Sequence, residues 1–386
     1  MKSLACLAIL LGFVAVPRAS DWPNFLGPTH DGISQEKGLI DRIPPQGPPL
    51  LWEKELGTGY AAPSVRQGRV AVFHRRRDVE ILEHLDAATG RLIWSRESAT
   101  RYQDPYGYNN GPRCTPLLTS NRCYTFGAEG RLACINLADG KAVWERETSK
   151  EFTIPEAFFG VGSTPWLEGD RLLVMVGGQP NSGMVALDAA TGKTLWESVG
   201  ETTWDGKPRL GWPGEPPVVW MPEEKIASYA SVLVTTMHGR RVAWCFTRQG
   251  LVALDPATGK VHFTRWFRSR VNDSVNAMTP VVHDDLVLIS SAYFRSGSVL
   301  LRVKKDLSGF DEVWKGLSLE MHWSQPILVD GALYTNFGTT KVSPDAVLAA
   351  ATLENSGTDA AIGTLSVQGG IRSEEHTSEL QSLAYL

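Results

Sequence analysis

The chain has 386 residues, of which 42% are hydrophobic and 21% are charged, and its formal net charge is −4. A hydrophobic fraction near the globular norm excludes a wholly disordered chain, and the small excess of acidic residues argues against a strongly basic nucleic-acid-binding protein. We therefore expect no nucleic-acid partner. No apolar run reaches the roughly 20 residues that a membrane-spanning helix needs, so we expect no membrane span.

Residues 1–20 have the pattern of a secretory signal peptide. Lys2 supplies a positive charge, and the apolar run from Leu4 to Val16 that follows is too short to span a bilayer. This pattern predicts export to the periplasm or cell envelope, with an uncleaved anchor as the alternative. We interpret residues 21–49 as an N-terminal extension.

Export permits disulfides, and the cysteines beyond the leader are Cys114, Cys123, Cys134 and Cys245. Cys123 and Cys134 flank an expected turn and would face each other across a hairpin. A bridge between them is one hypothesis, and buried free thiols are the other. The sequence contains no CxxC or CxxCH pattern, so redox, structural-zinc and covalent-haem sites lack support.

An internal repeat is the strongest signal in the chain. A turn phrase that ends in an aromatic residue recurs, for example from Leu187 to Trp196. The glycines of the five copies are Gly90, Gly140, Gly192, Gly259 and Gly309, spaced by 50, 52, 67 and 50 residues. A second marker has the same period, a proline before a short apolar strand, at Pro63, Pro116, Pro165, Pro280 and Pro326, with Ser231-Val232 in the unit that lacks it.

Each unit reads as four strands. In the second unit we predict strands at 115–119, 122–126, 131–136 and 142–147, separated by Gly, Asp and Asn. The turn phrase favours a tight turn, because its Asp accepts backbone N–H bonds and its Gly supplies a positive φ. The aromatic residues after the turns are too large for one small sheet to bury, so we expect them to dock on the neighbouring unit. These docking aromatics are Trp52, Trp94, Trp144, Trp196, Phe263 and Trp314. Four-stranded sheets that repeat radially predict an all-β fold, a β-propeller.

The turn phrase resembles the repeat of PQQ-like (pyrrolo-quinoline quinone repeat) β-propellers. That family includes quinoprotein alcohol dehydrogenases and the propeller lipoprotein of outer-membrane assembly. The segment from Asp21 to Gly32 is similar to the opening of exported propellers of planctomycetes and related bacteria. The resemblance covers residues 21–338. It implies the fold and says little about activity, because the repeat is a packing motif.

We place the propeller at residues 50–338, with about six blades visible and the last one incomplete. The resemblance implies seven or eight blades, so we expect a truncated chain. Residues 50–52 read as an outer strand that would pair with the last blade, and without that pairing they leave an open edge. We interpret residues 339–371 as an atypical, frameshifted tail, with a genuine flexible tail as the alternative. Residues 372–386 resemble a translated sequencing adapter.

The loops that enter the first strand of each unit carry the candidate ligand-binding residues, because such loops border one mouth of a propeller's channel. The candidates are Asn109, Asn110, Arg113, Asn272, Asp273, Asn276, His322 and Trp323. The aromatics Tyr60, Tyr108, Phe158 and Phe159 lie in the same loops. These groups could converge on a polar planar ligand or a cation; alternatively, they hydrogen-bond neighbouring blades and channel water. We identify no catalytic residue and no metal site.

The sequence favours a non-catalytic scaffold or binding module with protein partners in the periplasm or cell envelope and no cofactor. The first alternative is a dehydrogenase of alcohols or sugars that uses PQQ and Ca²⁺. The resemblance implies that such an enzyme stacks PQQ between a Trp and a disulfide of adjacent cysteines. No two cysteines are adjacent here, although Asp273 with Asn272 or Asn276 could supply oxygens to calcium. The second alternative is the sensor or substrate-binding part of a larger polypeptide.

Overall fold

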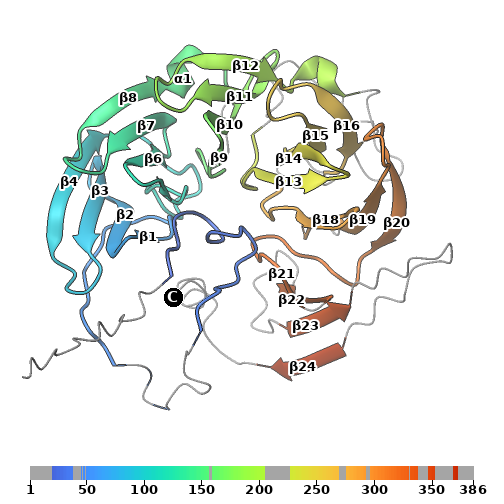
Figure 1. Ribbon diagram of the computed structural model, residues 1–386, viewed down its shortest axis with the longest axis horizontal. Coiled ribbons are helices and arrows are strands. Elements are labelled where there is room, and N and C mark those ends of the chain that lie inside the picture. The colour runs from blue at the N-terminus through green and yellow to red at the C-terminus, as the bar shows by residue number, and fades with distance from the viewer. Residues whose placement is uncertain are drawn as a thin grey trace, which may run out of the picture.

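The computed structural model describes residues 20–37, 45, 47, 49–155, 159–204, 227–268, 275–292, 296–329, 331–337, 347–352 and 368–372. In this part of the chain nearly all regular structure is β-strand, arranged as six four-stranded antiparallel sheets. The sheets follow one another in chain order around a common centre (Figure 1). The predicted all-β propeller is therefore confirmed.

The first three sheets comprise β1 (Ser64–Arg66), β2 (Arg69–Arg76), β3 (Val79–Asp86) and β4 (Leu92–Ala99); β5 (Leu117–Leu118), β6 (Arg122–Phe126), β7 (Arg131–Asn136) and β8 (Ala142–Glu147); and β9 (Trp166–Glu168), β10 (Arg171–Gly178), β11 (Ser182–Asp188) and β12 (Thr194–Ser198). The next three comprise β13 (Leu233–Met237), β14 (Arg240–Phe246), β15 (Gly250–Leu254) and β16 (Val261–Trp266); β17 (Val281–His283), β18 (Leu286–Ser291), β19 (Gly297–Val303) and β20 (Phe310–Gly316); and β21 (Ile327–Val329), β22 (Ala332–Phe337), β23 (Val347–Thr352) and β24 (Gln368–Arg372). Two short helices, α1 (Thr148–Glu151) and the 3₁₀-helix η1 (Glu201–Thr203), follow β8 and β12.

The second sheet shows how closely local pattern sets these elements. Strands β6, β7 and β8 have the predicted bounds, and β5 is shorter than predicted because Thr115 and Pro116 lie before it. In the first five sheets the outer strand pairs with the third strand through a register shift beside the turn, as at Cys134 and Ile135 of β7. The last sheet includes β23 and β24, which follow the predicted end of the propeller at residue 338; the predicted boundaries stay a prediction.

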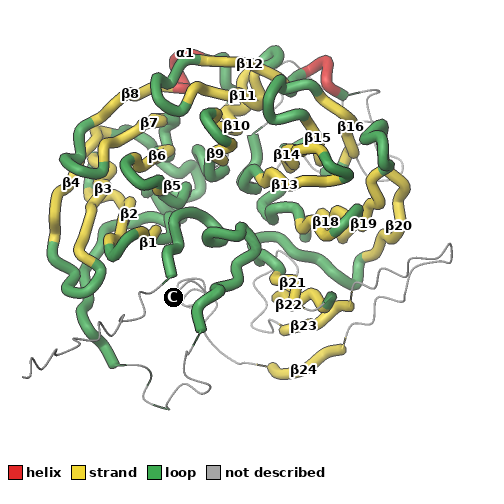
Figure 2. The backbone as a smooth tube through the Cα atoms, in the orientation of Figure 1, coloured by secondary structure: helices red, strands yellow, loops and turns green. Residues whose placement is uncertain are grey.

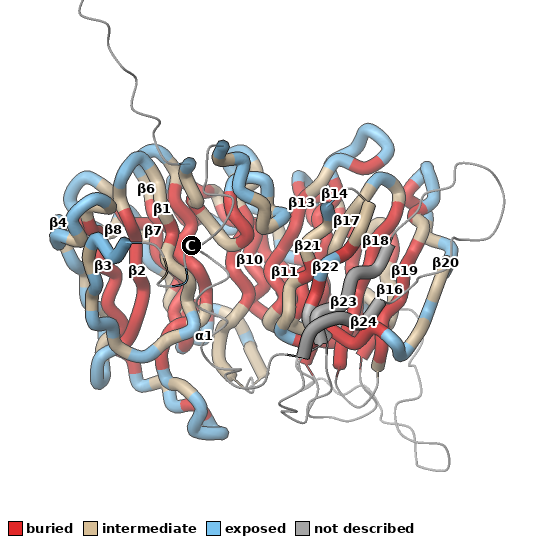
Figure 3. Tube along the Cα trace, turned by 90° about the horizontal axis from the view of Figure 1, so that it is seen from below, coloured by how far each residue is buried: buried red, intermediate tan, exposed pale blue. Residues whose placement is uncertain are grey.

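The hydrophobic core lies between neighbouring sheets rather than in the centre of the ring. Strands β2 and β3 are buried along most of their length, whereas the outer strand β4 alternates between exposed and half-buried residues (Figure 3). Among the residues that the structure describes, the buried side chains form five clusters, and four of them join adjacent sheets. Phe126 of β6 and Leu172 of β10, for example, belong to one cluster.

Four of the predicted docking aromatics make the same hydrogen bond to the turn of the following sheet. Three of them lie in outer strands, and the fourth, Trp52, precedes the first sheet. The indole N–H groups of Trp52, Trp94, Trp144 and Trp196 donate to the carbonyl oxygens of Ala87, Leu137, Ala189 and Pro256 at 2.9, 2.9, 3.0 and 3.2 Å, respectively. Each acceptor lies three residues before the turn glycine, and a Cβ on that glycine would lie within 2.8 Å of the indole. The other two aromatics lie differently. Phe263 packs on Phe310 at 5.5 Å between ring centroids, and Trp314 packs among the apolar side chains around Leu288.

A chain of hydrogen bonds also links successive sheets at the start of their first strands. Each member directly precedes a proline of the second sequence marker, or Val232 in the unit that lacks the proline. The members are Thr115, Thr164, Ser231, Thr279 and Gln325. The backbone N–H of each of the first four donates to the side-chain oxygen of the next, at 3.3, 3.2, 3.2 and 3.0 Å. We call these five residues the belt. Because Thr115, Thr164, Ser231 and Thr279 are buried, the belt satisfies donors that water cannot reach.

Residues 21–33, which we call the strap, cross the centre of the ring (Figure 2). Trp22 forms a two-bond bridge with Val65 of β1, and the carbonyl of Pro23 accepts the N–H of Leu118 in β5 at 2.7 Å. At the other end of the strap, a Cβ on Gly32 would lie 3.6 Å from Ile327 of β21. Among the side chains described, no apolar cluster joins the last sheet to the first. The strap therefore connects the two ends of the row of sheets.

Two predictions made from the sequence, a disulfide and an outer strand, are not found in the structure. Cys123 and Cys134 are buried free thiols, so the hypothesis of a bridge is wrong. Cys123 pairs with Ile135 and Tyr124 pairs with Cys134, so the two thiols lie on opposite faces of the sheet. Residues 50–52 form no strand, and Leu50 and Leu51 are 75% and 81% exposed. In the described part of the chain, no helix is long and apolar enough to cross a membrane.

Candidate functional site

The two ends of the channel differ in the segments that border them. One end, which we call the turn face, carries the turn phrases and the strap. The opposite end, the entry face, carries the connections between successive sheets and α1 (Figure 3). The loops that were predicted to border one mouth therefore share the entry face.

Five aromatic side chains meet at this mouth, and we call them the mouth cluster: Tyr106, Tyr108, Phe159, Tyr229 and Trp323. The ring centroid of Phe159 lies 5.3 Å from that of Tyr106, 6.1 Å from that of Tyr108, 5.5 Å from that of Tyr229 and 6.4 Å from that of Trp323. The Tyr229 hydroxyl accepts the N–H of Phe159 at 2.8 Å. Phe159 thus holds the cluster together.

The mouth cluster spans the channel. Its members precede β5, β9, β13 and β21, so the cluster connects the second, third, fourth and last sheets. Tyr106, Tyr108 and Trp323 are 50%, 70% and 52% exposed. Large aromatic rings that remain this exposed and adjacent are unusual on the surface of a monomer and are characteristic of interaction sites.

The polar candidates before β5 are used within their own loop. The Arg113 guanidinium contacts the Asp104 carboxylate at 2.9 Å, and the side chains are 8% and 0% exposed. The Asn110 side-chain oxygen accepts the N–H of Asp104 at 2.7 Å, and that of Asn109 accepts the N–H of Gly111 at 2.8 Å. These three predicted residues therefore stabilise the loop that presents Tyr106 and Tyr108.

Two aromatic rings extend this network. The Arg113 guanidinium lies 5.8 Å from the ring centroid of Tyr60 and 5.3 Å from that of Tyr102. Tyr60 is 57% exposed at the entry face, whereas burial raises the pKa of Tyr102 to about 12. Because the guanidinium of Arg113 is paired with Asp104 and lies over two aromatic rings, its role is structural.

Asn276 and His322, the other polar candidates in the described ranges, are buried. The Asn276 side-chain amide donates to the carbonyl oxygens of Thr247 and Phe267 at 2.8 and 2.9 Å. His322 packs against the Trp323 ring at 4.4 Å between centroids, and burial lowers its pKa to about 3. The imidazole is therefore neutral at ordinary pH and contacts Trp323 edge to face.

The structure separates the predicted site into two groups. Trp323, Tyr108 and Phe159 belong to the mouth cluster, whereas five predicted polar residues support the loops behind it: Asn109, Asn110, Arg113, Asn276 and His322. Asn272, Asp273 and Phe158 lie outside the described residues. Sequence reasoning missed Tyr106 and Tyr229 as site residues, although both lie in entry loops and an aromatic count of those loops would have found them.

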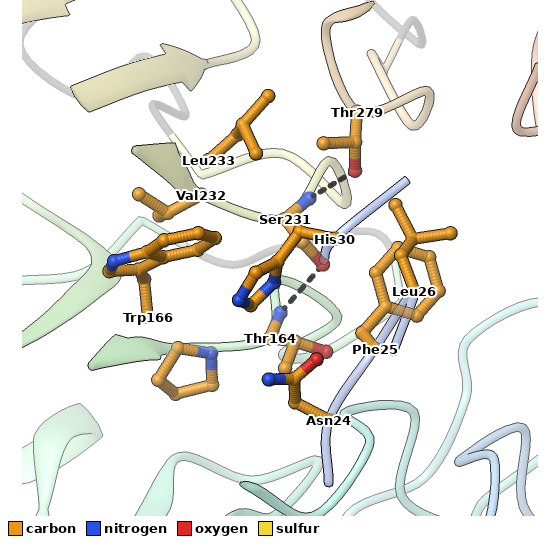
Figure 4. Close-up of a pocket in the computed structure, with 11 residues that line it drawn as sticks. Asn24, Phe25, Leu26, His30, Thr164, Trp166, Ser231, Val232, Leu233 and Thr279 are labelled. Carbon is orange, nitrogen blue, oxygen red and sulfur yellow. Dashed lines mark hydrogen bonds between the residues drawn. The ribbon is translucent and has the colours of Figure 1, made fainter. Parts of the chain in front are cut away.

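At the turn face the strap leaves a small pocket above the belt (Figure 4). Its volume of about 20 Å³ is enough for roughly one water molecule. His30 lies in it between Phe25 and Trp166, with 3.9 Å between the ring centroids of His30 and Trp166. Burial lowers the pKa of His30 to about 4, although neighbouring Asp31 acts in the opposite direction. The pocket is too small for an organic ligand while the strap is in place.

The described residues do not fit PQQ with calcium. The Asp104 carboxylate at the entry face is already paired with Arg113, and the Asn276 amide is aimed at backbone carbonyls. The four described cysteines are separate and buried, so they cannot supply a disulfide of adjacent residues. No group of three or more His, Cys, Asp or Glu side chains in the described ranges could hold a metal ion.

Comparison with known proteins gives one family. The model of the family described as outer membrane protein assembly factor BamB matches residues 77–336. No curated protein matches the chain.

Two solved structures illustrate what the chain resembles. BamB from Moraxella catarrhalis is 15% identical with a TM-score of 0.53, and the match covers 82% of this chain and 76% of that one. Quinohemoprotein alcohol dehydrogenase ADHIIG from Pseudomonas putida HK5 is 14% identical with a TM-score of 0.42, covering 75% of this chain and 56% of that one. Only the first likeness is close enough to show a shared fold.

Proposed function

Because the chain belongs to the family of the outer membrane protein assembly factor BamB, we propose that it is an exported, non-catalytic β-propeller that serves as a scaffold or binding module for proteins of the periplasm or cell envelope. The mouth cluster is the proposed binding surface. The name of the family, which refers to protein assembly, agrees with a protein-binding role.

The exposed aromatic rings of the mouth cluster carry this proposal. Tyr and Trp are enriched at the energetic centres of protein interfaces, because each buries a large rigid surface and keeps a polar tip for a hydrogen bond. Tyr108 and Trp323 both lie against the ring of Phe159 and are more than half exposed. A partner that covers both would bury the centre of the entry face.

The rigidity of the surrounding loops supports the same proposal. The loop that carries Tyr106 and Tyr108 is held by the buried pair of Arg113 and Asp104, and Trp323 rests on buried His322. A surface that is ordered before binding loses less conformational entropy when a partner docks. The polar candidates thus contribute to binding by positioning the aromatic rings.

The test uses two variants in the mouth cluster and one matched control. Trp323→Ala and Tyr108→Ala each remove an exposed ring of the cluster, and Tyr334→Ala removes a ring on β22 that is 46% exposed. Crosslinking in cell envelopes with each variant as bait identifies partners, and titration with the purified partner measures its Kd. We expect each mouth variant to weaken binding by about 30-fold or more, the effect of losing an aromatic hot spot of about 2 kcal/mol, and the control to bind normally.

Two results would contradict the proposal. Partners that bind the mouth variants and the control equally would place the interface elsewhere on the propeller. A rise in melting temperature on addition of PQQ and Ca²⁺, together with dye-linked oxidation of an alcohol or sugar, would favour the dehydrogenase instead.

A further inference from the structure

The strap has three features that a simple N-terminal extension does not need. It is bonded to the first two sheets through Trp22 and Pro23, and its far end reaches Ile327 of the last sheet. It folds back on itself, with a Cβ on Gly27 placed only 2.7 Å from the Trp22 ring. The strap therefore has a defined conformation that depends on contacts along its whole length.

A histidine of the strap, His30, lies in the pocket over the belt. His30 stacks on Trp166, which is itself 8% exposed. The other residues that line the pocket are Asn24, Phe25, Leu26, Thr164, Pro165, Ser231, Val232, Leu233 and Thr279, and none of them can accept or release a proton near neutral pH. An imidazolium in this pocket would therefore lack a compensating carboxylate from the sheets.

The charged groups around the pocket do not change this conclusion. Asp31 is the neighbour of His30 in the chain, and its carboxylate accepts bonds from the Thr29 hydroxyl and the Ile33 N–H at 2.6 and 2.9 Å. Glu168 lies behind Trp166, where it accepts the indole N–H and pairs with Arg241. Both carboxylates thus accept bonds from other donors, and the charge of Asp31 raises the pKa of His30 less than burial lowers it.

We propose that residues 21–33 are a pH-sensitive strap that ties the first sheet to the last, and that protonation of His30 releases it from the channel. Release would free the backbone groups of Val65 and the N–H of Leu118, and it would open the turn face of the channel. The entry face, with the mouth cluster, would remain as it is. This property is separate from the proposed protein-binding function.

The direction of the pH effect follows from proton linkage. In the closed state the pKa of His30 is about 4, below its ordinary value of 6.5, so the released state binds protons more tightly. Closure is therefore strongest above pH 6.5 and weakens as the pH falls toward 4. With these two pKa values, the ratio of closed to released strap falls by about 20-fold between pH 7 and pH 5.

Amide hydrogen exchange of the full chain tests this directly. The N–H groups of Trp22, Gly27, His30 and Gly32 all donate within or from the strap, and their protection reports the opening equilibrium after correction for the intrinsic pH dependence of exchange. We expect the strap's protection to fall by about 20-fold from pH 7 to pH 5. The amides of β6 should keep their protection.

Substitutions at His30 separate release from general loosening at acid pH. His30→Phe keeps an aromatic ring against Trp166 and cannot be protonated, so its strap should stay protected at pH 5; His30→Gln serves the same purpose if the Phe variant does not fold. His30→Ala should lower protection at both pH values. Equal protection of the natural chain at pH 7 and pH 5, or an equal loss at pH 5 in His30→Phe, would overturn the proposal.

Discussion

Replacing Gly192 with alanine should destabilise the propeller more than the backbone conformation alone requires. Gly192 has φ +72°, and a Cβ there would lie 2.7 Å from Trp144 of the preceding sheet. The left-handed conformation costs an alanine about 1 to 2 kcal/mol. The clash additionally displaces an indole that donates to Ala189 at 3.0 Å.

The size of the second effect follows from what Trp144 contacts. Truncation of a fully buried Trp costs about 3 to 5 kcal/mol; because Trp144 is only half-buried, we expect about 3 kcal/mol for Trp144→Ala. Gly192→Ala should therefore cost about 2 to 4 kcal/mol, more than the backbone cost alone and less than the sum of the backbone cost and the loss of the docked ring.

Guanidinium-induced unfolding, followed by circular dichroism, measures these differences. Gly68 is the matched control, because its φ is +71° and nothing lies within 4 Å of its Cβ position; Gly68→Ala should show only the backbone cost. The double variant Gly192→Ala with Trp144→Ala should be more stable than the sum of the single effects predicts, by about 1 to 2 kcal/mol, because the clash disappears with the ring. Equal costs at Gly192 and Gly68, or strict additivity, would refute docking of Trp144 on this turn.

Three further predictions concern other buried groups. Thr164→Val should lower the free energy of unfolding by about 1 to 3 kcal/mol, because the buried N–H of Thr115 loses its acceptor; Thr164→Ser should recover most of the loss in the same unfolding assay. Arg113→Met should cost about 3 to 5 kcal/mol, because it leaves the fully buried Asp104 carboxylate without its partner, and adding Asp104→Asn should restore part of it; no recovery would contradict the ion-pair assignment. The four described cysteines should not react with a thiol reagent in the native protein and should all react after unfolding, because burial raises the pKa of every one of these thiols.

The repeat made the fold predictable from the sequence. In a turn phrase such as that from Leu187 to Trp196, the local sequence is enough to predict the structure. Its Asp and Gly favour the turn, and alternating apolar and polar residues favour the strand. The chain repeats this pattern with a nearly constant period, so the bounds predicted for β6, β7 and β8 are those that the structure has. The belt was predicted only in part. The prolines were recognised as markers of the repeat, but the hydroxyl or amide side chains before them were not recognised as hydrogen-bond acceptors.

The register between β6 and β7 could not be predicted from the local sequence pattern. Cys123 and Cys134 lie on either side of the same turn, and their spacing was compatible with a cross-strand pair. The pairing of Cys123 with Ile135 shifts them by one residue. Because side chains alternate between the two faces of a strand, a shift of one residue places the thiols on opposite sides of the sheet.

The sequence by itself determined the four-stranded unit, its period and the end of the channel at which the entry loops gather, because each depends on local pattern. Only the tertiary structure decided which side chains meet there. Tyr108 and Trp323 contact the same ring of Phe159 although they are far apart in the chain, and the polar residues beside them turn inward to hold their loops. The strap was equally hidden, since nothing local in residues 21–33 shows that they reach both the first and the last sheet. Curvature of the whole row of sheets creates these contacts, and curvature is a property of packing between sheets rather than of any one repeat.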